Sequence, residues 1–277
     1  MTGLLPEKLY GIIGHPLGHS LSPLIHNSGF QRLGFPGVYL CWELAPEKLP
    51  MFMQAVRTLP VSGLSVTIPY KRAVVPYLDG ITPLARSVGA VNTIFWDGED
   101  LMGDNTDVPG FLAPLKDRGA QPEHCLVLGA GGAARAVLAG LRSLGTQRVS
   151  ISSRDMDKSR ALAEEFEGEA LSWEDRAGCR PDLLVNATPL GMHGRYETMS
   201  PWPHTPLPDS LRWVYDLIYN PEETPLVRIA REAGRSVITG LPMFVHQAAA
   251  QFALWTGMTL PADETASLVK ASLSKAR

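Results

Sequence analysis

A run of glycines between an apolar segment and a helical one constrains this chain more than any other feature. Residues 125–132 read CLVLGAGG, and residues 133–145, AARAVLAGLRSLG, have the apolar spacing of an amphipathic helix that stops at Gly145. Glycines at a strand-to-helix junction let backbone N–H groups approach a phosphate at the helix N-terminus. The junction therefore predicts a dinucleotide site rather than a bare structural turn. Its expected cofactor-binding residues are Gly129, Ala130, Gly131, Gly132 and Ala133.

The end of the next predicted strand bears on the choice of cofactor. An NAD-binding unit usually places an acidic residue there to bind the ribose 2′-OH. Residues 152–158 read SSRDMDK, and Arg154 and Lys158 suit a 2′-phosphate, while the carboxylate of Asp155 would repel it. The alternative is a solvated helix start, with Asp155 as its cap and Lys158 on the surface. We expect NADP, bound by Ser153, Arg154 and Lys158, and NAD stays possible.

Strand-like and helix-like segments alternate along the whole chain, which predicts an α/β protein. The apolar runs LYGII, VYLCWEL, LSVTI and TIFW are expected strands of the first half, and residues 97–100, DGED, predict a hairpin turn. The second half repeats the alternation from Cys125 onward, with expected strands RVSISSR, DLLVNATP, WVYDLIY and SVITG. Residues 244–257 and 262–273 are expected to be helices.

Composition and charge exclude several classes of protein. Hydrophobic residues make up 45 % of the chain and charged residues 19 %, so a full core is expected and long disorder is not. The formal charge is −3 and no basic run stands out, so we expect no nucleic acid as partner. No stretch approaches the roughly 20 apolar residues of a membrane span. The N-terminus lacks a signal-peptide core, and three scattered cysteines predict a soluble, cytoplasmic protein.

Three polar segments follow or interrupt strand-like runs in the first half. They read SVTIPYK, GAVNT and GDNTDVPG, and they offer Thr67, Lys71, Asn92 and Asp107. A lysine, a carboxylate, an amide and hydroxyls together indicate a pocket for a small polyhydroxylated acid, with an acid–base pair. Each segment also has a simpler interpretation, since Asn92 can satisfy a turn and Asp107 can cap a helix.

Residues 14–27, GHPLGHSLSPLIHN, raise the question of a metal site. His15 and His19 are four positions apart, but Pro16 and Gly18 disfavour a regular helix through them, and no acidic ligand is near in the sequence. We therefore expect no metal, and histidines that fix the loop by hydrogen bonds.

The ordered series of these motifs with NATPLGM and GLPMFVHQAAAQFALWTG resembles the shikimate dehydrogenase family, including its quinate/shikimate relatives, from Gly14 to Gly257. The resemblance implies two α/β domains. One is an N-terminal substrate domain with a mixed sheet, formed by residues 1–106 and the returning helices of 241–277. The other is a Rossmann-type NADP-binding domain, residues 107–240.

The resemblance also implies roles for individual residues and a reaction. Lys71 and Asp107 match the family's catalytic pair, and Ser20 and Ser22 match the serines that bind the substrate carboxylate. The further residues that it implies are Thr67, Asn92, Tyr219 and Gln247 for substrate, and Thr188 and Gly240 near the nicotinamide. The implied reaction is the reversible reduction of 3-dehydroshikimate to shikimate by NADPH.

Two departures from the family pattern leave alternatives open. Ser65 stands where asparagine is usual, and Asp155 replaces a threonine of the NADP clamp. One alternative is an NAD-preferring quinate/shikimate dehydrogenase. The other is a non-catalytic dinucleotide-binding regulatory module, which would not need both Lys71 and Asp107. The expected partners are small molecules, with no membrane, and the chain is expected to be a monomer or homodimer.

Overall fold

Two six-stranded sheets, each containing apolar runs, organise the chain in the computed structural model, which describes residues 5–18, 20–203 and 205–275. The chain folds into two compact units. The first comprises residues 1–106 and 247–277, and the second comprises residues 107–246. The division falls inside one helix, α8 (Gly240–Thr256), whereas the predicted domain boundary lies at residues 240 and 241. That boundary stays a prediction.

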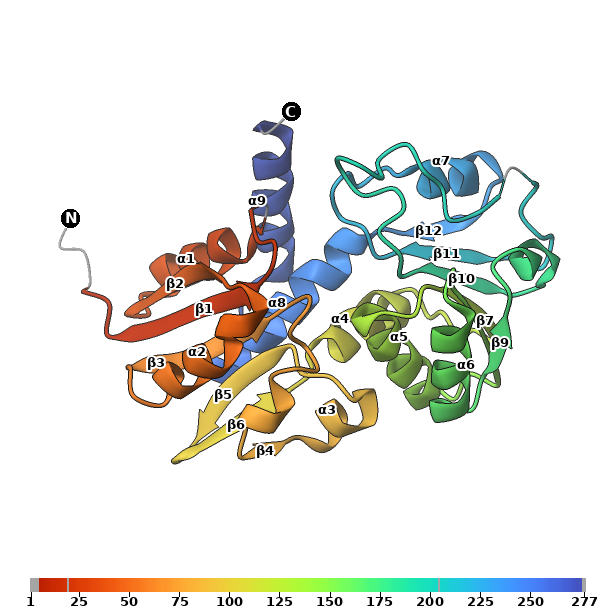
Figure 1. Ribbon diagram of the computed structural model, residues 1–277. Helices are drawn as coiled ribbons and strands as arrows, with labels where there is room; N and C mark the ends of the chain where they lie inside the picture. Colours follow the sequence, from red (N-terminus) through yellow and green to blue (C-terminus); the bar gives the residue numbers. More distant parts are fainter. Residues whose placement is uncertain (1–4, 19, 204, 276–277) are drawn as a thin grey trace. The chain divides into compact units, whose positions relative to one another are not determined.

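The first unit is built on a mixed six-stranded sheet with strand order β2-β1-β3-β5-β6-β4 (Figure 1). Strand β1 pairs in parallel with β2 and β3, while β5 pairs antiparallel with β3 and β6. Its strands are β1 (Lys8–Gly14), β2 (Gly37–Glu43), β3 (Val61–Val66), β4 (Gly80–Ile81), β5 (Thr93–Asp97) and β6 (Asp100–Asp104). Its helices are α1 (Ser22–Leu33), α2 (Leu49–Val56), α3 (Pro83–Val88), the second part of α8, and α9 (Ala262–Lys275).

The expected elements of the first half are present. The predicted hairpin turn joins β5 to β6, where Asp97 pairs with Asp100 and Gly98 takes a φ of 62°, the left-handed conformation that glycine accepts at no cost. Strand β4 and helix α3 were not expected from the sequence. Thr82 caps α3, since its side chain accepts a hydrogen bond from the N–H of Ala85.

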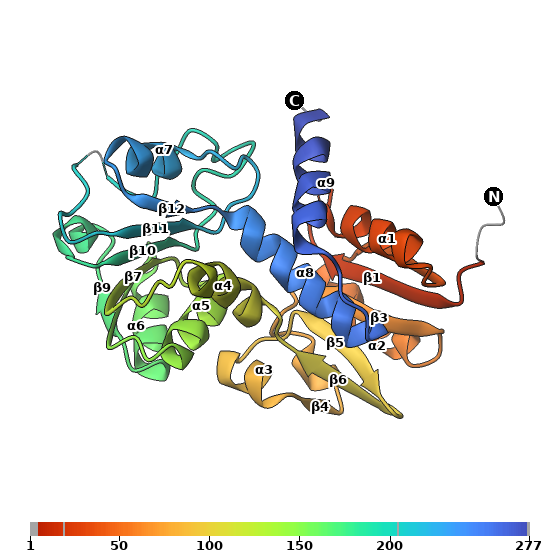
Figure 2. The same cartoon turned by 180° about the vertical axis from the view of Figure 1, so that it is seen from behind.

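The second unit contains a parallel six-stranded sheet with strand order β12-β11-β10-β7-β8-β9. Read from β9, this order is 3-2-1-4-5-6 in the chain order of the unit, the order of the Rossmann fold. Figures 1 and 2 show α5 and α6 on the opposite side of this sheet from α7. The strands are β7 (His124–Leu128), β8 (Arg148–Ser152), β9 (Glu169–Leu171), β10 (Leu183–Asn186), β11 (Trp213–Asp216) and β12 (Ser236–Ile238). The helices are α4 (Asp107–Asp117), α5 (Gly132–Ser143), α6 (Met156–Glu165), α7 (Pro225–Glu232) and the first part of α8.

Buried apolar strands form the core of the second unit. Residues 125–128 of β7 and 183–185 of β10 are fully buried, which explains why these strands are continuous apolar runs rather than alternating ones. Helix α5 packs on α4 at Gly140, where a Cβ atom would lie 2.8 Å from the ring of Phe111. Among the described helices, none is both long and apolar enough to cross a membrane.

Candidate active site

The polar loops predicted in the first half lie next to one another at one end of the first sheet. The N–H of His15 donates to the carbonyl of Ile68 (2.9 Å), which joins the loop after β1 to the loop after β3. The N–H of Val91 donates to the carbonyl of Lys71 (2.7 Å), which joins the second of these loops to residues 89–93. Gly14 permits this arrangement, because a Cβ atom there would lie 2.4 Å from Cγ2 of Thr67.

Asn92 is held at the centre of this set of loops. Its Oδ1 accepts from the N–H of Thr106 (2.7 Å) and from Oγ1 of Thr93 (2.7 Å), and its Nδ2 donates to Oγ1 of Thr106 (3.0 Å). All three side chains are buried. Asp107, the first residue of α4, follows Thr106 directly and is 6 % exposed. The expected turn role of Asn92 is therefore real, and it fixes the backbone beside Asp107.

The two serines of the opening motif lie at the start of α1. Ser22 is the first residue of that helix, and its N–H lies 3.4 Å from Oγ of Ser20. Leu21 at the N-cap contributes no side-chain hydrogen bond, and the first turn holds no acidic residue. An uncapped helix N-terminus favours a negative charge, so this position suits a carboxylate.

The expectation that histidines fix the opening loop is only partly correct. Nδ1 of His15 lies 3.2 Å from Oε1 of Glu43, whose other oxygen accepts from the N–H of Leu17 (3.1 Å). An acidic side chain thus does lie beside His15, and the last residue of β2 provides it. His26 lies inside α1 rather than in the loop; it is buried and stacks on Tyr39 at 4.5 Å, and burial lowers its pKa to about 3. His19 lies outside the described residues.

The C-terminal part of α8 contributes a buried glutamine that the sequence analysis missed. Gln251 is 2 % exposed; its Nε2 donates to the carbonyl of Asn92 (3.0 Å) and to Oγ1 of Thr93 (2.9 Å). Its Oε1 accepts from Oγ of Ser65 (2.9 Å), the residue that departs from the family pattern. The expected substrate residue Gln247 lies one helical turn earlier in α8. A second glutamine at four-residue spacing in an apolar helix was the available signal.

In the second unit, the predicted glycine loop lies at the point where the strand order reverses. Strands β7 and β10 are neighbours there, and their following loops touch. Gly129 has a φ of 118°, and a Cβ atom on it would lie 2.7 Å from the carbonyl oxygen of Ala187. Gly131 is the N-cap of α5 and provides no side chain to its first turn. The loop therefore leaves the N–H groups of α5 available to a pyrophosphate, as the Rossmann geometry requires.

The start of α6 resolves the two interpretations of Asp155. Its Oδ1 accepts from the N–H of Lys158 (3.2 Å), so it is the N-cap of α6, and its Oδ2 lies 2.8 Å from Nζ of Lys158. The hydrogen bond from Lys158 lowers the pKa of Asp155. Arg154 is exposed, and Oγ of Ser153 hydrogen-bonds Ser159 at 2.8 Å. Lys158, which suits a 2′-phosphate, is thus paired with Asp155, the residue whose carboxylate would repel that phosphate.

The remaining predicted residues of the second unit, Thr188, Tyr219 and Gly240, follow β10, β11 and β12 in turn, and Gly240 is the first residue of α8. Thr188 donates its hydroxyl to Oδ1 of Asn186 (2.7 Å). Tyr219 stacks on Phe244 of α8 at 4.3 Å. The N–H of Gly240 donates to the carbonyl of Ile218 (3.1 Å), and a Cβ atom at Gly240 would lie 2.2 Å from the carbonyl oxygen of Leu217. The glycine is therefore required for this close approach.

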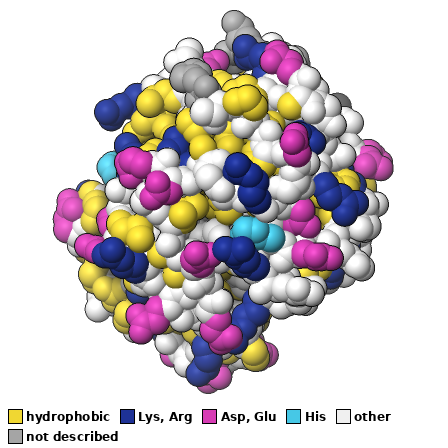
Figure 3. Space-filling view, turned by 90° about the vertical axis from the view of Figure 1, so that its right-hand side faces the viewer, with side chains coloured by type: hydrophobic (Ala, Val, Ile, Leu, Met, Phe, Trp, Pro, Cys, Tyr) yellow, Lys and Arg dark blue, Asp and Glu magenta, His cyan; other side chains and the backbone are white. Residues whose placement is uncertain are grey.

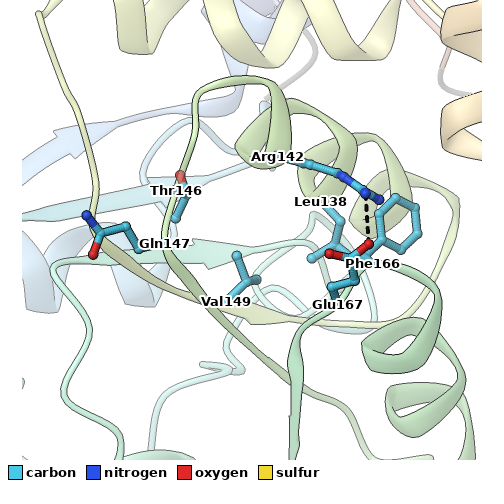
Figure 4. Close-up of a pocket in the computed structure, with 7 residues that line it drawn as sticks. All are labelled: Leu138, Arg142, Thr146, Gln147, Val149, Phe166 and Glu167. Carbon is cyan, nitrogen blue, oxygen red and sulfur yellow. Dashed lines mark hydrogen bonds and ion pairs between the residues drawn. The ribbon is translucent and has the colours of Figure 1, made fainter.

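Two surface hollows lie away from these loops. One, of about 140 Å³, lies where α5 and α6 end and β8 begins, at the opposite ends of the strands from the glycine loop, and the ion pair of Arg142 with Glu167 crosses it (Figure 4). The other, of about 320 Å³, lies between α1 and α9. Within the described part of the chain, no three His, Cys, Asp or Glu side chains gather as a metal site would require. On the face drawn in Figure 3, basic and acidic side chains are interspersed.

Comparison with known proteins identifies the family. Residues 12–94 match the family model of the shikimate dehydrogenase substrate binding domain, and residues 240–270 match that of the shikimate 5′-dehydrogenase C-terminal domain. A shikimate dehydrogenase (NADP(+)) of Oleidesulfovibrio alaskensis is 50 % identical over 273 residues, which cover 98 % of this chain and 97 % of the relative. The chain belongs to the shikimate dehydrogenase family.

Solved structures of the family have the same fold. A shikimate 5-dehydrogenase of Thermus thermophilus, in complex with NADP(H) and shikimate, is 38 % identical with a TM-score of 0.86, over 95 % of this chain and 98 % of that one. A quinate dehydrogenase of Corynebacterium glutamicum, in complex with NAD, is 29 % identical with the same TM-score of 0.86, over 95 % and 98 %. The predicted α/β fold with a Rossmann-type unit is confirmed.

Proposed function

We propose that this chain catalyses the reversible, NADPH-dependent reduction of 3-dehydroshikimate to shikimate, a step of aromatic amino acid biosynthesis. The observation that carries the proposal is the near-complete match to NADP(+)-dependent shikimate dehydrogenases, at 50 % identity over 98 % of the chain. The polar loops joined around Asn92 and the glycine loop at the strand-order reversal support it. When bound, the nicotinamide supplies the hydride that reduces the ketone.

The chain's own residues would bind the substrate and move the proton. Lys71 donates a proton to the oxygen that becomes the hydroxyl, and takes one in the reverse direction, while Asp107 orients Lys71 and accepts a hydrogen bond from a substrate hydroxyl. Ser20 and Ser22, at the uncapped N-terminus of α1, bind the carboxylate. The expected partners of the remaining substrate groups are Thr67, Asn92, Tyr219 and Gln247.

The cofactor residues fit an NADP nucleotide. Gly129, Ala130, Gly131, Gly132 and Ala133 leave the backbone of the α5 N-terminus open to the pyrophosphate. Thr188 follows β10, the strand beside β7, and Gly240 begins α8. Arg154 supplies a planar, bidentate partner for the 2′-phosphate. Ser153 and Lys158 flank it at the start of α6. Asp155 is already occupied as the cap of α6 and as the ion-pair partner of Lys158, so its carboxylate has partners other than a ribose hydroxyl.

A second candidate is an NAD-linked quinate or shikimate dehydrogenase. The presence of Asp155 beside the ribose position favours it, and so does the similarity to a quinate dehydrogenase in complex with NAD. The pairing of Asp155 with Lys158 makes this candidate the weaker one. A cytoplasmic location and a monomeric or homodimeric state stay predictions.

One assay separates the candidates. Oxidation of NADPH by the purified chain is followed with 3-dehydroshikimate, repeated with NADH, and the reverse reaction is run with shikimate and with quinate. We expect kcat/KM to be highest for NADPH with 3-dehydroshikimate. Equal rates with NADH would contradict the NADP assignment. If neither NADPH nor NADH is oxidised, the remaining candidate is the non-catalytic dinucleotide-binding regulatory module.

A further inference from the structure

A carboxylate that the proposed mechanism does not use lies fully buried at the end of β11. Asp216 is 0 % exposed, and so are its neighbours Asn186 and Thr224. Within residues 5–18, 20–203 and 205–275, no lysine, arginine or histidine forms an ion pair with Asp216. Its contacts are the N–H, amide and hydroxyl groups described below. A buried charge without a counter-charge costs stability, so its presence calls for another explanation.

The two oxygens of Asp216 bind two different loops. Oδ1 accepts from Nδ2 of Asn186 (2.9 Å) and from the N–H of Ile218 (3.1 Å). Oδ2 accepts from Oγ1 of Thr224 (2.6 Å). The carboxylate therefore closes the loop of residues 217–224 at both ends, and it links that loop to the end of β10.

On the β10 side, the carboxamide of Asn186 passes this constraint to Thr188. Oδ1 of Asn186 accepts from the N–H of Thr188 (3.0 Å) and from its Oγ1 (2.7 Å), while Nδ2 also donates to the carbonyl of Leu190 (3.1 Å). The hydrogen bond to Asp216 fixes which end of the amide is the donor. It thereby fixes the oxygen toward Thr188.

On the β11 side, the closed loop carries Tyr219 and supports Gly240. Tyr219 stacks on Phe244, and the carbonyl of Ile218 accepts from the N–H of Gly240. Thr224 also caps α7, because its Oγ1 accepts from the N–H of Val227 (3.2 Å). The carboxylate of Asp216 is thus connected by hydrogen bonds and chain continuity to Thr188 and Gly240, which we assign to the cofactor. It is connected in the same way to Tyr219, which we assign to the substrate.

We propose that Asp216 is a positioning residue that sets the cofactor loop at Thr188 and the substrate loop at Tyr219 relative to each other, through Asn186 and Thr224. The proposal rests on the proposed function, because the roles of Thr188 and Tyr219 do. A charged acceptor suits this task, since its hydrogen bonds are stronger than those of a neutral group and three donors converge on it.

Asp216 acts through two connections, which we call the cofactor arm (Asn186 to Thr188) and the substrate arm (Thr224 to the loop that carries Tyr219). The test compares variants of the two arms by their NADPH affinity and by steady-state kinetics. Asp216→Ala removes both arms, and we expect the NADPH Kd and the KM for 3-dehydroshikimate each to rise by about tenfold or more, since misplacement by about 1 Å can cost up to 10²-fold. Asp216→Asn keeps an acceptor for Asn186 and should restore the NADPH Kd. Thr224→Val should raise the KM for 3-dehydroshikimate with little change in the NADPH Kd, and Thr224→Ser should resemble the wild type.

Asp182 provides a matched control at the other end of the same strands. Its carboxylate accepts from the N–H groups of Glu123 (2.9 Å) and His124 (3.0 Å), away from the loops after β10 and β11. Asp182→Ala should lower the Tm and leave the NADPH Kd and the substrate KM unchanged.

The outcomes separate the inference from the proposed function. Unchanged constants in Asp216→Ala, or equal effects of Asp216→Ala and Asp182→Ala, would overturn the inference. If Asp216→Ala does not fold, the comparison of Thr224→Val with Thr224→Ser tests the inference instead. An equal KM for 3-dehydroshikimate in these two variants would overturn the inference. Wild-type protein that binds NADPH but does not reduce 3-dehydroshikimate would refute the proposed function, while the NADPH Kd of Asp216→Ala would still test the cofactor arm.

Discussion

At the scale of single residues, backbone contacts place the proposed catalytic lysine. The carbonyl of Lys71 accepts from Val91, one residue before Asn92, and the carbonyl of Asn92 accepts from the N–H of Val66 (2.7 Å). The backbone of Lys71 is therefore held near Asn92, a residue that we propose binds substrate, by hydrogen bonds between main-chain groups. A substitution of its side chain should leave this arrangement intact.

Lys71→Ala tests the proton transfer. We expect kcat to fall by about 10²–10⁴-fold, the range of general acid–base catalysis, with a much smaller rise in KM, because the lost interaction is made mainly in the transition state. The measurement is steady-state reduction of 3-dehydroshikimate by NADPH. The exposed neighbour Arg72 provides the control, and Arg72→Ala should be close to wild type. A kcat near the wild-type value in Lys71→Ala would refute the assignment.

At the scale of elements, the N-termini of α1 and α6 differ in whether a side chain caps them. Helix α6 has its own cap in Asp155, and the adjacent Arg154 stays exposed. Helix α1 has no side-chain cap, and Ser20 and Ser22 stand at its start. A helix N-terminus carries a partial positive charge, so the uncapped start of α1 suits the substrate carboxylate that we assign to it, whereas the start of α6 already has the carboxylate of Asp155.

Arg154→Ala tests the cofactor choice. We expect the KM for NADPH to rise by about tenfold or more, which corresponds to about 1.4 kcal/mol, since a bidentate contact with the 2′-phosphate is lost. The KM for NADH should hardly change. Arg160→Ala is the control, because Arg160 is exposed within α6, the helix that follows Arg154, and pairs with Asp157. Equal increases for NADPH and NADH in Arg154→Ala would show that Arg154 does not bind the phosphate.

Ser20→Ala and Ser22→Ala test the start of α1. Each should weaken shikimate binding by about 1–3 kcal/mol, the cost of losing a hydrogen bond to a charged group. Calorimetric titration with shikimate and, separately, with NADPH measures both affinities, and the NADPH affinity should not change. Ser28→Ala, in the same helix, is the control. Equal losses for both ligands would instead indicate that the serines support folding.

At the scale of the whole molecule, the buried carboxylate makes stability depend on pH. Burial raises the pKa of Asp216 from 3.8 to about 6, although hydrogen bonds from Thr224, Ile218 and Asn186 oppose the shift. Between these pH values the folded chain binds a proton that the unfolded chain has released. The contribution of Asp216 to the free energy of unfolding therefore falls as the pH rises from about 4 to about 6.

Asp216→Asn removes this dependence. A shift of about two pKa units corresponds to about 3 kcal/mol. As the pH rises from about 4 to about 7, the free energy of unfolding of the wild type should therefore fall by about that amount relative to that of the variant. Urea unfolding of both proteins across this range measures the difference. A difference that is independent of pH, or one that grows in favour of the wild type, would contradict the prediction.

Local features of the sequence were sufficient to predict the alternation of strands and helices in both halves of the chain and the positions of the polar and glycine loops. Apolar periodicity and turn residues act over a few positions, so the strands other than β4 and β9, the hairpin at Gly98 and the glycine loop at Gly129 could be recognised without a structure. The assignment of individual roles to Ser20, Lys71 and Asp107 required the resemblance to a family. Short elements such as β4 and β9 carry too few residues to show a pattern.

Only the tertiary structure decided how polar groups pair across the chain. Glu43 meets Leu17 across 26 positions, Asp216 meets Asn186 across 30, and Gln251 meets Asn92 across 159. Such pairs leave no local periodicity, because each is made by strands and helices that the sheet order brings together. Whether Asp155 opposes NADP was undecided for the same reason: its sequence neighbours allow either role, and the geometry of the α6 N-terminus selects the cap. Buried polar groups must find partners, but folding determines which partners they find.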